Sequence, residues 1–200
     1  MDAEGWDRRY AEKEWVLSLE PNHVVVELVS PLNPGRALEL GAGEGRHAVW
    51  LARHGWQVTA VDFSRVALEK AHRRAQECGV ELECVLADVR DLRPAPRGYD
   101  LVLLAYMHPQ LPEREAVFAA IAETVAPGGH LLVVGLDLTD PRAGRGGADR
   151  EWRYTPSQLS GAFPDIELTR CESVTRAVET DGGAEQAIDT LFWGYRPAGS

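Results

Sequence analysis

Three alternating glycines carry the clearest chemical signal in this sequence. They lie in the stretch Glu39-Leu40-Gly41-Ala42-Gly43-Glu44-Gly45-Arg46, between a short apolar run and a helix-forming segment. A strand, a glycine-rich turn and a helix N-terminus, in that order, bring backbone amides close to a nucleotide-like ligand. Glycine suits such a turn because a Cβ atom would collide with the ligand or oppose a positive φ angle.

The spacing of the glycines and the acid before them narrow the choice of ligand. A dinucleotide-binding fingerprint reads G-x-G-x-x-G, but here the third glycine comes one residue early, and Arg46 stands where that fingerprint needs glycine. Glu39 lies two residues before the first glycine. A carboxylate there is a poor neighbour for a pyrophosphate and a good one for a cationic ligand such as S-adenosylmethionine (SAM), which has an ammonium, a sulfonium and no phosphate.

The stretch resembles motif I of the class I SAM-dependent methyltransferases, whose pattern is E/D-x-G-x-G-x-G. In that family the loop wraps the methionyl part of SAM, and the acid helps to bind its amino group. The resemblance therefore implies that the loop binds the cofactor through Glu39, Gly41, Ala42, Gly43 and Gly45. The alternative is a glycine-rich turn without a ligand.

Two later acids fit the same ligand. Asp62 ends the next expected strand about 20 residues past the glycine loop, where a carboxylate can accept hydrogen bonds from both ribose hydroxyls, and Phe63 can pack on the adenine. The segment that begins at Ala87 resembles the family's A-D-x-x-x-L pattern. That resemblance implies that Asp88 takes the exocyclic amine of adenine, with Val89 at the adenine edge. Asp62 could instead be a helix N-cap, and Asp88 a turn residue.

The N-terminal section is expected to cover the cofactor. Residues 4–20 have the periodicity of a helix that Pro21 ends. The sequence Trp6-Asp7-Arg8-Arg9-Tyr10 resembles the W-D-x-R-Y opening of small class I methyltransferases that act on small molecules or metalloid ions. There it starts a helical lid, which implies that Tyr10 and Trp15 line the pocket. A docking helix whose aromatic side chains belong to the core is the alternative.

The methyl acceptor is expected beside a buried central strand. Residues 99–105 form an apolar run whose C-terminal end falls where open α/β sheets bind ligands. We therefore expect Ala105 at the cofactor and His108 as a candidate general base, unless His108 is fixed in the structure next to Pro109. No D/N-P-P-Y/F segment follows this strand, which argues against methylation of amide or adenine nitrogens.

The predicted architecture is α/β, a Rossmann-like, mostly parallel seven-stranded sheet with helices on both faces and a C-terminal antiparallel hairpin. We expect one domain over 1–200, with a helical lid at 1–34, a SAM-binding core at 35–135, and a substrate-side loop and hairpin at 136–200. The expected strands are 36–40, 57–61, 81–86, 99–105, 130–135, 166–178 and 187–195. The expected helices are 4–20, 22–29, 46–54, 64–79, 113–125 and 156–159, and a long connection spans 137–152.

Composition limits the environment and the partners. The formal net charge of −10 argues against binding to nucleic acid or to anionic membranes. Three scattered cysteines, Cys78, Cys84 and Cys171, form no metal-binding or disulfide pattern. The N-terminus does not resemble a signal peptide, and no apolar run approaches membrane-spanning length. We expect a soluble cytoplasmic protein without a metal.

The expected function is methyl transfer from SAM to a small-molecule or metalloid nucleophile. Alternatives are a methyltransferase of protein or tRNA, a SAM-binding protein without chemistry, and an oxidoreductase that binds NAD on the same type of sheet. The acidic charge disfavours tRNA, and the early third glycine disfavours NAD. The sequence leaves open the identity of the acceptor and the choice between monomer and homodimer.

Overall fold

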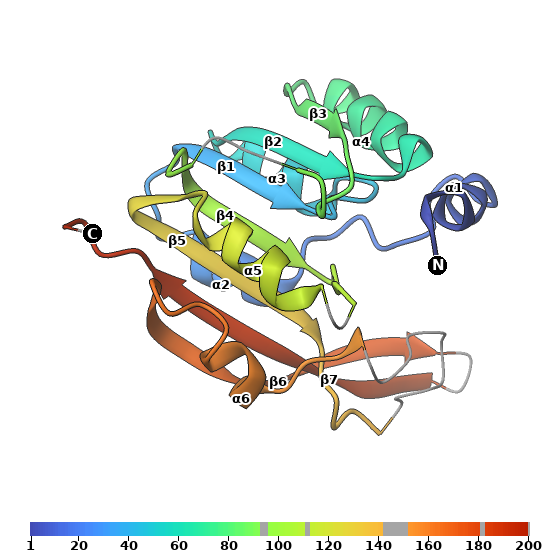
Figure 1. Ribbon diagram of the computed structural model, residues 1–200. Helices are drawn as coiled ribbons and strands as arrows, with labels where there is room; N and C mark the ends of the chain where they lie inside the picture. The colour runs from blue at the N-terminus through green and yellow to red at the C-terminus, as the bar shows by residue number, and fades with distance from the viewer. Residues whose placement is uncertain (93–95, 111–112, 142–151, 181–182, 200) are drawn as a thin grey trace.

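The computed structural model describes residues 1–92, 96–110, 113–141, 152–180 and 183–199. Seven strands form one sheet in the order β3-β2-β1-β4-β5-β7-β6 (Figure 1). The strands are β1 (Arg36–Leu40), β2 (Gln57–Asp62), β3 (Glu83–Leu86), β4 (Tyr99–Ala105), β5 (Val125–Leu136), β6 (Glu167–Thr180) and β7 (Gly183–Tyr195). The first five are parallel, whereas β7 runs antiparallel to both β5 and β6. This confirms the predicted sheet and its C-terminal hairpin.

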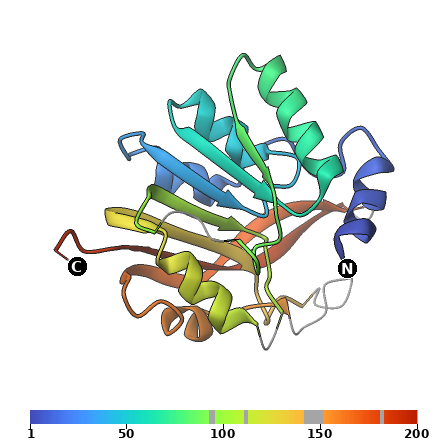
Figure 2. The same ribbon diagram turned by 45° about the horizontal axis from the view of Figure 1, so that its top comes forward.

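Helices cover both faces of the sheet, as predicted (Figures 1 and 2). They are α1 (Ala3–Ala11), α2 (His23–Val29), α3 (Arg46–Arg53), α4 (Arg65–Glu77), α5 (Arg114–Ala122) and α6 (Pro156–Ser160). Local sequence sets several of their ends. Asn22 and Ser64 cap α2 and α4 through side-chain oxygens that accept from backbone N–H groups, and Thr155 with Gln158 forms a capping box on α6. None of the helices in the described ranges combines the length and apolar character needed to cross a membrane.

Two apolar clusters, one on each face, hold the layers together. One packs Phe118 and Ile121 of α5 and Leu159 of α6 against the sheet, and the other packs α2 and α3 against its opposite face. Strand β4 lies between them, and its residues from Leu101 to Leu104 are fully buried. A strand buried on both faces needs apolar residues at consecutive positions, which explains the continuous apolar run in the sequence.

The structure corrects two predicted boundaries in particular. The N-terminal helix ends at Ala11 instead of residue 20, because the backbone groups that follow bond to side chains elsewhere in the protein. Strand β5 begins at Val125, and its register against β4 shifts where Pro127 and the two following glycines were expected to form a turn. The predicted long connection at 137–152 falls largely on residues 142–151, outside the described residues, as do parts of the connections at 93–98 and 181–183.

Candidate active site

The glycine-rich loop follows β1 at the carboxyl edge of the sheet. Its three glycines, Gly41, Gly43 and Gly45, have φ angles of 72°, 55° and 79°. A Cβ atom on Gly45 would lie 2.8 Å from the Ala71 Cβ and 3.1 Å from the Ala71 Cα, so α4 approaches this turn too closely for any other residue. Ala42 is buried between the first two glycines. The loop thus has the conformation that its sequence predicted.

Glu39 is almost fully buried beside the loop, with 1% of its surface exposed. Its Oε1 accepts a hydrogen bond from the His47 Nδ1 at 2.9 Å. Its Oε2 is buried and has no hydrogen-bond partner among the described residues. An unpaired buried carboxylate oxygen is costly, so a group that donates to it from a ligand would be strongly favoured.

His47 orients this carboxylate and stays neutral. Its Nδ1 faces Glu39, and its Nε2 accepts from the backbone N–H of Asn22 at 3.3 Å. Burial lowers the pKa of His47, against the opposing effect of the Glu39 hydrogen bond. Both ring nitrogens are therefore used in fixed contacts, and His47 serves the site by holding Glu39.

Asp62 ends β2 next to the glycine loop. Its Oδ2 accepts from the Gly43 N–H and its Oδ1 from the Ser64 N–H, both at 2.8 Å. Burial raises the pKa of Asp62, while these backbone hydrogen bonds lower it. A carboxylate has about four acceptor sites, so with backbone hydrogen bonds from Gly43, Phe63 and Ser64 it keeps acceptor capacity for a ribose hydroxyl, and the predicted role is compatible with these contacts. Phe63 follows, partly buried, and its packing on adenine stays a prediction.

Asp88 and Val89 follow β3 and are partly buried. Both oxygens of Asp88 contact the Arg90 guanidinium, at 2.9 Å from Nε and 2.5 Å from Nη2. The Arg90 hydrogen bond is the main reason why the pKa of Asp88 is lowered. An adenine amine would have to share this carboxylate with Arg90. The predicted adenine contacts of Asp88 and Val89 stay predictions.

Tyr10 reaches the glycine loop from α1, and Trp15 contacts α4. The Tyr10 hydroxyl lies 3.0 Å from the position that a Cβ atom of Gly43 would take. Burial, followed by the charges of Asp62 and Glu44, raises the pKa of Tyr10. Trp15, beyond the end of α1, lies against α4, with the Arg73 guanidinium 5.2 Å from its ring. Its predicted place in the wall of the cofactor pocket stays a prediction.

The general-base prediction for His108 conflicts with its hydrogen bonds. The Nε2 atom accepts from the backbone N–H of Leu136 at 3.0 Å, and the ring also bonds to the backbone of Tyr106. Burial, followed by the charges of Arg114 and Arg153, lowers the pKa of His108 to about 3. To take a proton from a substrate, the ring would first have to give up its contact with Leu136, so these hydrogen bonds favour a structural role, and the role of His108 as a general base stays a prediction.

Tyr106, which the sequence did not single out as a site residue, has an unusual backbone conformation and a fixed side chain at this edge. It follows Ala105, which is buried at the end of β4, and it has a φ of 61°, rare for a bulky side chain. Its hydroxyl accepts from the Asn22 Nδ2 and donates to the Asp189 Oδ2, both at 2.6 Å. Burial and the charge of Asp189 raise its pKa.

Two arginines flank the Tyr106 ring, with the guanidinium carbons of Arg46 and Arg176 at 5.0 and 5.3 Å from its centroid. The Arg176 Nε also donates to the Asp189 Oδ2 at 2.7 Å. The group combines residues from α3, β6, β7 and the position directly after β4, and Tyr106 and Asp189 are 83 positions apart. Its only sequence signal was its place at the C-terminal end of a central strand.

Together, these features define a class of protein. An open, mostly parallel α/β sheet carries a glycine-rich loop and two buried acids at its carboxyl edge, which is where Rossmann-like proteins bind nucleotide-type cofactors. Residues 37–129 match a family model described as a methyltransferase domain. In this match, in a relative named as an O-methyltransferase and in its fold, the chain is similar to the class I SAM-dependent methyltransferases, as the glycine motif implied.

Individual relatives agree with this assignment. The chain is 32% identical over 141 residues to a ubiquinone biosynthesis O-methyltransferase of Yersinia pestis, covering 63% of this chain and 58% of that protein. It thus spans less than two thirds of the length of the curated relatives it matches. TehB from Haemophilus influenzae has a similar fold, with a TM-score of 0.76 and 16% identity over 88% of this chain and 62% of that one. The N-methyltransferase NodS from Bradyrhizobium japonicum, solved with S-adenosylhomocysteine, gives a TM-score of 0.71 and 17% identity over 96% and 97%.

Proposed function

We propose that this chain transfers a methyl group from SAM to a small-molecule nucleophile by in-line displacement. The observation that carries this proposal is the buried Oε2 of Glu39 beside the glycine loop, which no described residue contacts through a hydrogen bond. A ligand with an ammonium group supplies the missing donor at this oxygen, and SAM has one at its methionyl end. Pyrophosphate, in contrast, would add negative charge next to a buried carboxylate.

The other residues of the site fit the same cofactor. The three glycines leave space where side chains would otherwise stand, and Asp62 offers carboxylate lone pairs beside the loop. When bound, SAM supplies a methyl group on a sulfonium, which is already an excellent leaving group. The protein therefore needs mainly to position the two reactants and to exclude water.

The residues near the C-terminal end of β4, where we expect the methyl acceptor, support a nucleophile that needs no histidine base. His47 and His108 both have their ring nitrogens in fixed hydrogen bonds, and Tyr106 has a raised pKa and a hydroxyl with two partners. A thiolate or a metalloid anion reacts without such a base, whereas an alcohol needs one. The name of the Yersinia relative, a ubiquinone biosynthesis O-methyltransferase, supports a small-molecule acceptor.

Protein or tRNA substrates and cofactor binding without catalysis are the alternatives. The net charge of −10 gives little support to an electrostatic contact with tRNA. A protein that only binds SAM would not need an ordered group of side chains where the methyl acceptor is expected, such as the group around Tyr106.

A transfer assay with SAM labelled in its methyl group tests the proposal. Thiols, phenols and metalloid oxyanions are offered separately, with tRNA and protein extracts as further acceptors. We expect label on one small-molecule class, and we expect Asp62→Ala to abolish the transfer. Label on tRNA or protein alone, or binding of SAM without transfer to any acceptor, would contradict it.

A further inference from the structure

Helix α4 makes contacts on two faces. Its apolar face, made of Ala67, Leu68, Ala71 and Ala75, is buried toward the rest of the fold. Positions 66, 70, 73 and 74 form a second face, since residues three and four apart align on a helix. Each of these four contacts the N-terminal segment between Asp7 and Leu19.

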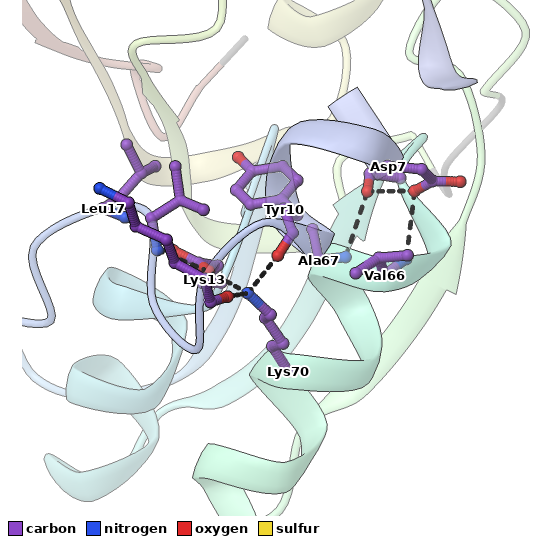
Figure 3. A network of polar contacts seen from close by, with 10 residues as sticks. Asp7, Tyr10, Lys13, Leu17, Val66, Ala67 and Lys70 are labelled. Atoms are coloured by element: carbon purple, nitrogen blue, oxygen red, sulfur yellow. Dashed lines mark hydrogen bonds and ion pairs between the residues drawn. The ribbon is translucent and has the colours of Figure 1, made fainter. Parts of the chain in front are cut away.

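Lys70 is the centre of this second face (Figure 3). Its Nζ donates to the backbone oxygens of Tyr10 at 2.5 Å and Lys13 at 2.7 Å, and to the Glu44 Oε1 at 2.9 Å. An ammonium group has three N–H donors, so these acceptors use all of them. The side chains of Lys70 and Glu44 are only 11% and 3% exposed, which shields their attraction from water and salt.

Glu44 connects this ion pair to the glycine-rich loop, because it stands between Gly43 and Gly45. Its carboxylate also accepts from the backbone N–H groups of Val16 and Leu17 at 2.9 to 3.1 Å. One buried charge pair thus joins three parts of the protein, namely the N-terminal segment, the glycine loop and α4.

A second anchor lies at the start of α4. The Asp7 Oδ1 accepts from the Ser64 Oγ at 2.5 Å and from the Val66 N–H at 3.2 Å. Ser64 also donates its backbone N–H to Asp62. The N-terminal segment is therefore fixed at both sides of Tyr10, whose hydroxyl stands over Gly43.

We propose that Lys70 is a positioning residue, which holds residues 7–17 over the glycine loop and thereby sets the affinity for the cofactor. This inference rests on the proposed function. Lysine fits the position because its three donors can converge on three separate acceptors, whereas the planar fork of arginine suits a paired acceptor. Only two of the 21 basic residues, Lys13 and Lys70, are lysines, and Lys70 occupies this position.

Two measurements on the full chain test the proposal. Calorimetric titration with S-adenosylhomocysteine is expected to give at least a tenfold weaker affinity for Lys70→Met than for the wild type. Hydrogen exchange without ligand is expected to speed up at residues 12–18 in the same variant, because Glu44, which accepts from the Val16 and Leu17 amides, is then no longer held by Lys70. Lys70→Arg keeps the charge and should recover part of both properties.

Gln76→Ala is the matched control, since Gln76 is exposed on the same helix and bonds to His72 instead of the N-terminal segment. We expect it to leave affinity and exchange unchanged. Unaltered affinity in Lys70→Met, or unaltered exchange at residues 12–18, would overturn the proposal. If Lys70→Met does not fold, Asp7→Asn carries the same test through the second anchor. A wild type that fails to bind would overturn the proposed function, while exchange would still report whether Lys70 docks the segment.

Discussion

Replacing Glu39 by glutamine is expected to change ligand affinity and folding stability in different ways. Glutamine has nearly the same size, and its side-chain oxygen can still accept the His47 hydrogen bond. The substitution removes a negative charge from a residue that is 1% exposed and has one oxygen without a partner among the described residues. It also removes the charge that would hold an ammonium group.

The size of the effect follows from the type of hydrogen bond that is lost. Hydrogen bonds to charged groups contribute about 1.5–3 kcal/mol. At about 1.4 kcal/mol for each tenfold change, Glu39→Gln should weaken binding of S-adenosylhomocysteine by about 10- to 150-fold. The free energy of unfolding without ligand should stay within about 1 kcal/mol of the wild type or rise, because an incompletely paired buried charge is costly to fold.

Calorimetric titration and urea unfolding measure the two quantities separately. Glu81→Gln, which removes an exposed acid before β3, is the control and should change neither. Wild-type affinity in Glu39→Gln would refute the assignment of the open oxygen to a ligand. A loss of several kcal/mol of stability would instead show that the carboxylate serves mainly to hold His47.

Three further predictions concern the surroundings of the site. Gly45→Ala places a Cβ atom 2.8 Å from the Ala71 Cβ at a φ of 79°, so it should lower the free energy of unfolding by about 1–3 kcal/mol. An unchanged melting temperature would contradict this close approach. Tyr106→Phe removes a hydrogen-bond donor from Asp189, which is 1% exposed, and should lower the free energy of unfolding in urea by about 1–3 kcal/mol. Wild-type stability would show that the hydroxyl contacts are dispensable. The pKa of His108 in the folded chain is about 3, below its ordinary 6.5, so the unfolded chain takes up a proton first as the pH falls. The contribution of neutral His108 to folding stability is therefore complete above about pH 6.5 and is lost as the pH falls toward 3. His108→Gln should therefore flatten the pH dependence of stability by up to about 1.4 kcal/mol per pH unit, and an unchanged slope would refute the neutral, buried state.

Local sequence patterns predicted the sheet and the glycine loop well, because short-range physics determines both. The apolar run of β4 requires burial on two faces, and the glycines at 41, 43 and 45 require positive φ angles. The same reasoning found Glu39 and Asp62 at the ends of strands. The carboxyl ends of parallel strands lie at one edge of a sheet, so residues at those ends can be expected to lie close together even when their side-chain contacts are unknown.

Contacts between distant residues explain what the sequence could not predict. Helix periodicity favoured a helix through residue 20, but Lys70 and Glu44 bind the backbone of residues 10–17 and end it early. The partnership of Tyr106 with Asp189 depends on how the terminal hairpin lies beside β5. His108 follows the C-terminal end of β4 as expected, and its hydrogen bond to Leu136, which the sequence could not predict, favours a structural role.

Calorimetric titration of the wild-type chain with SAM, S-adenosylhomocysteine and NAD(H) tests the central claim most directly, with Asp62→Ala measured in parallel. A site built around Glu39, the glycine loop and Asp62 should bind SAM and S-adenosylhomocysteine, fail to bind NAD(H), and lose its ligands in the variant. Binding of NAD(H), or of none of the three, would contradict the assignment of this site to SAM.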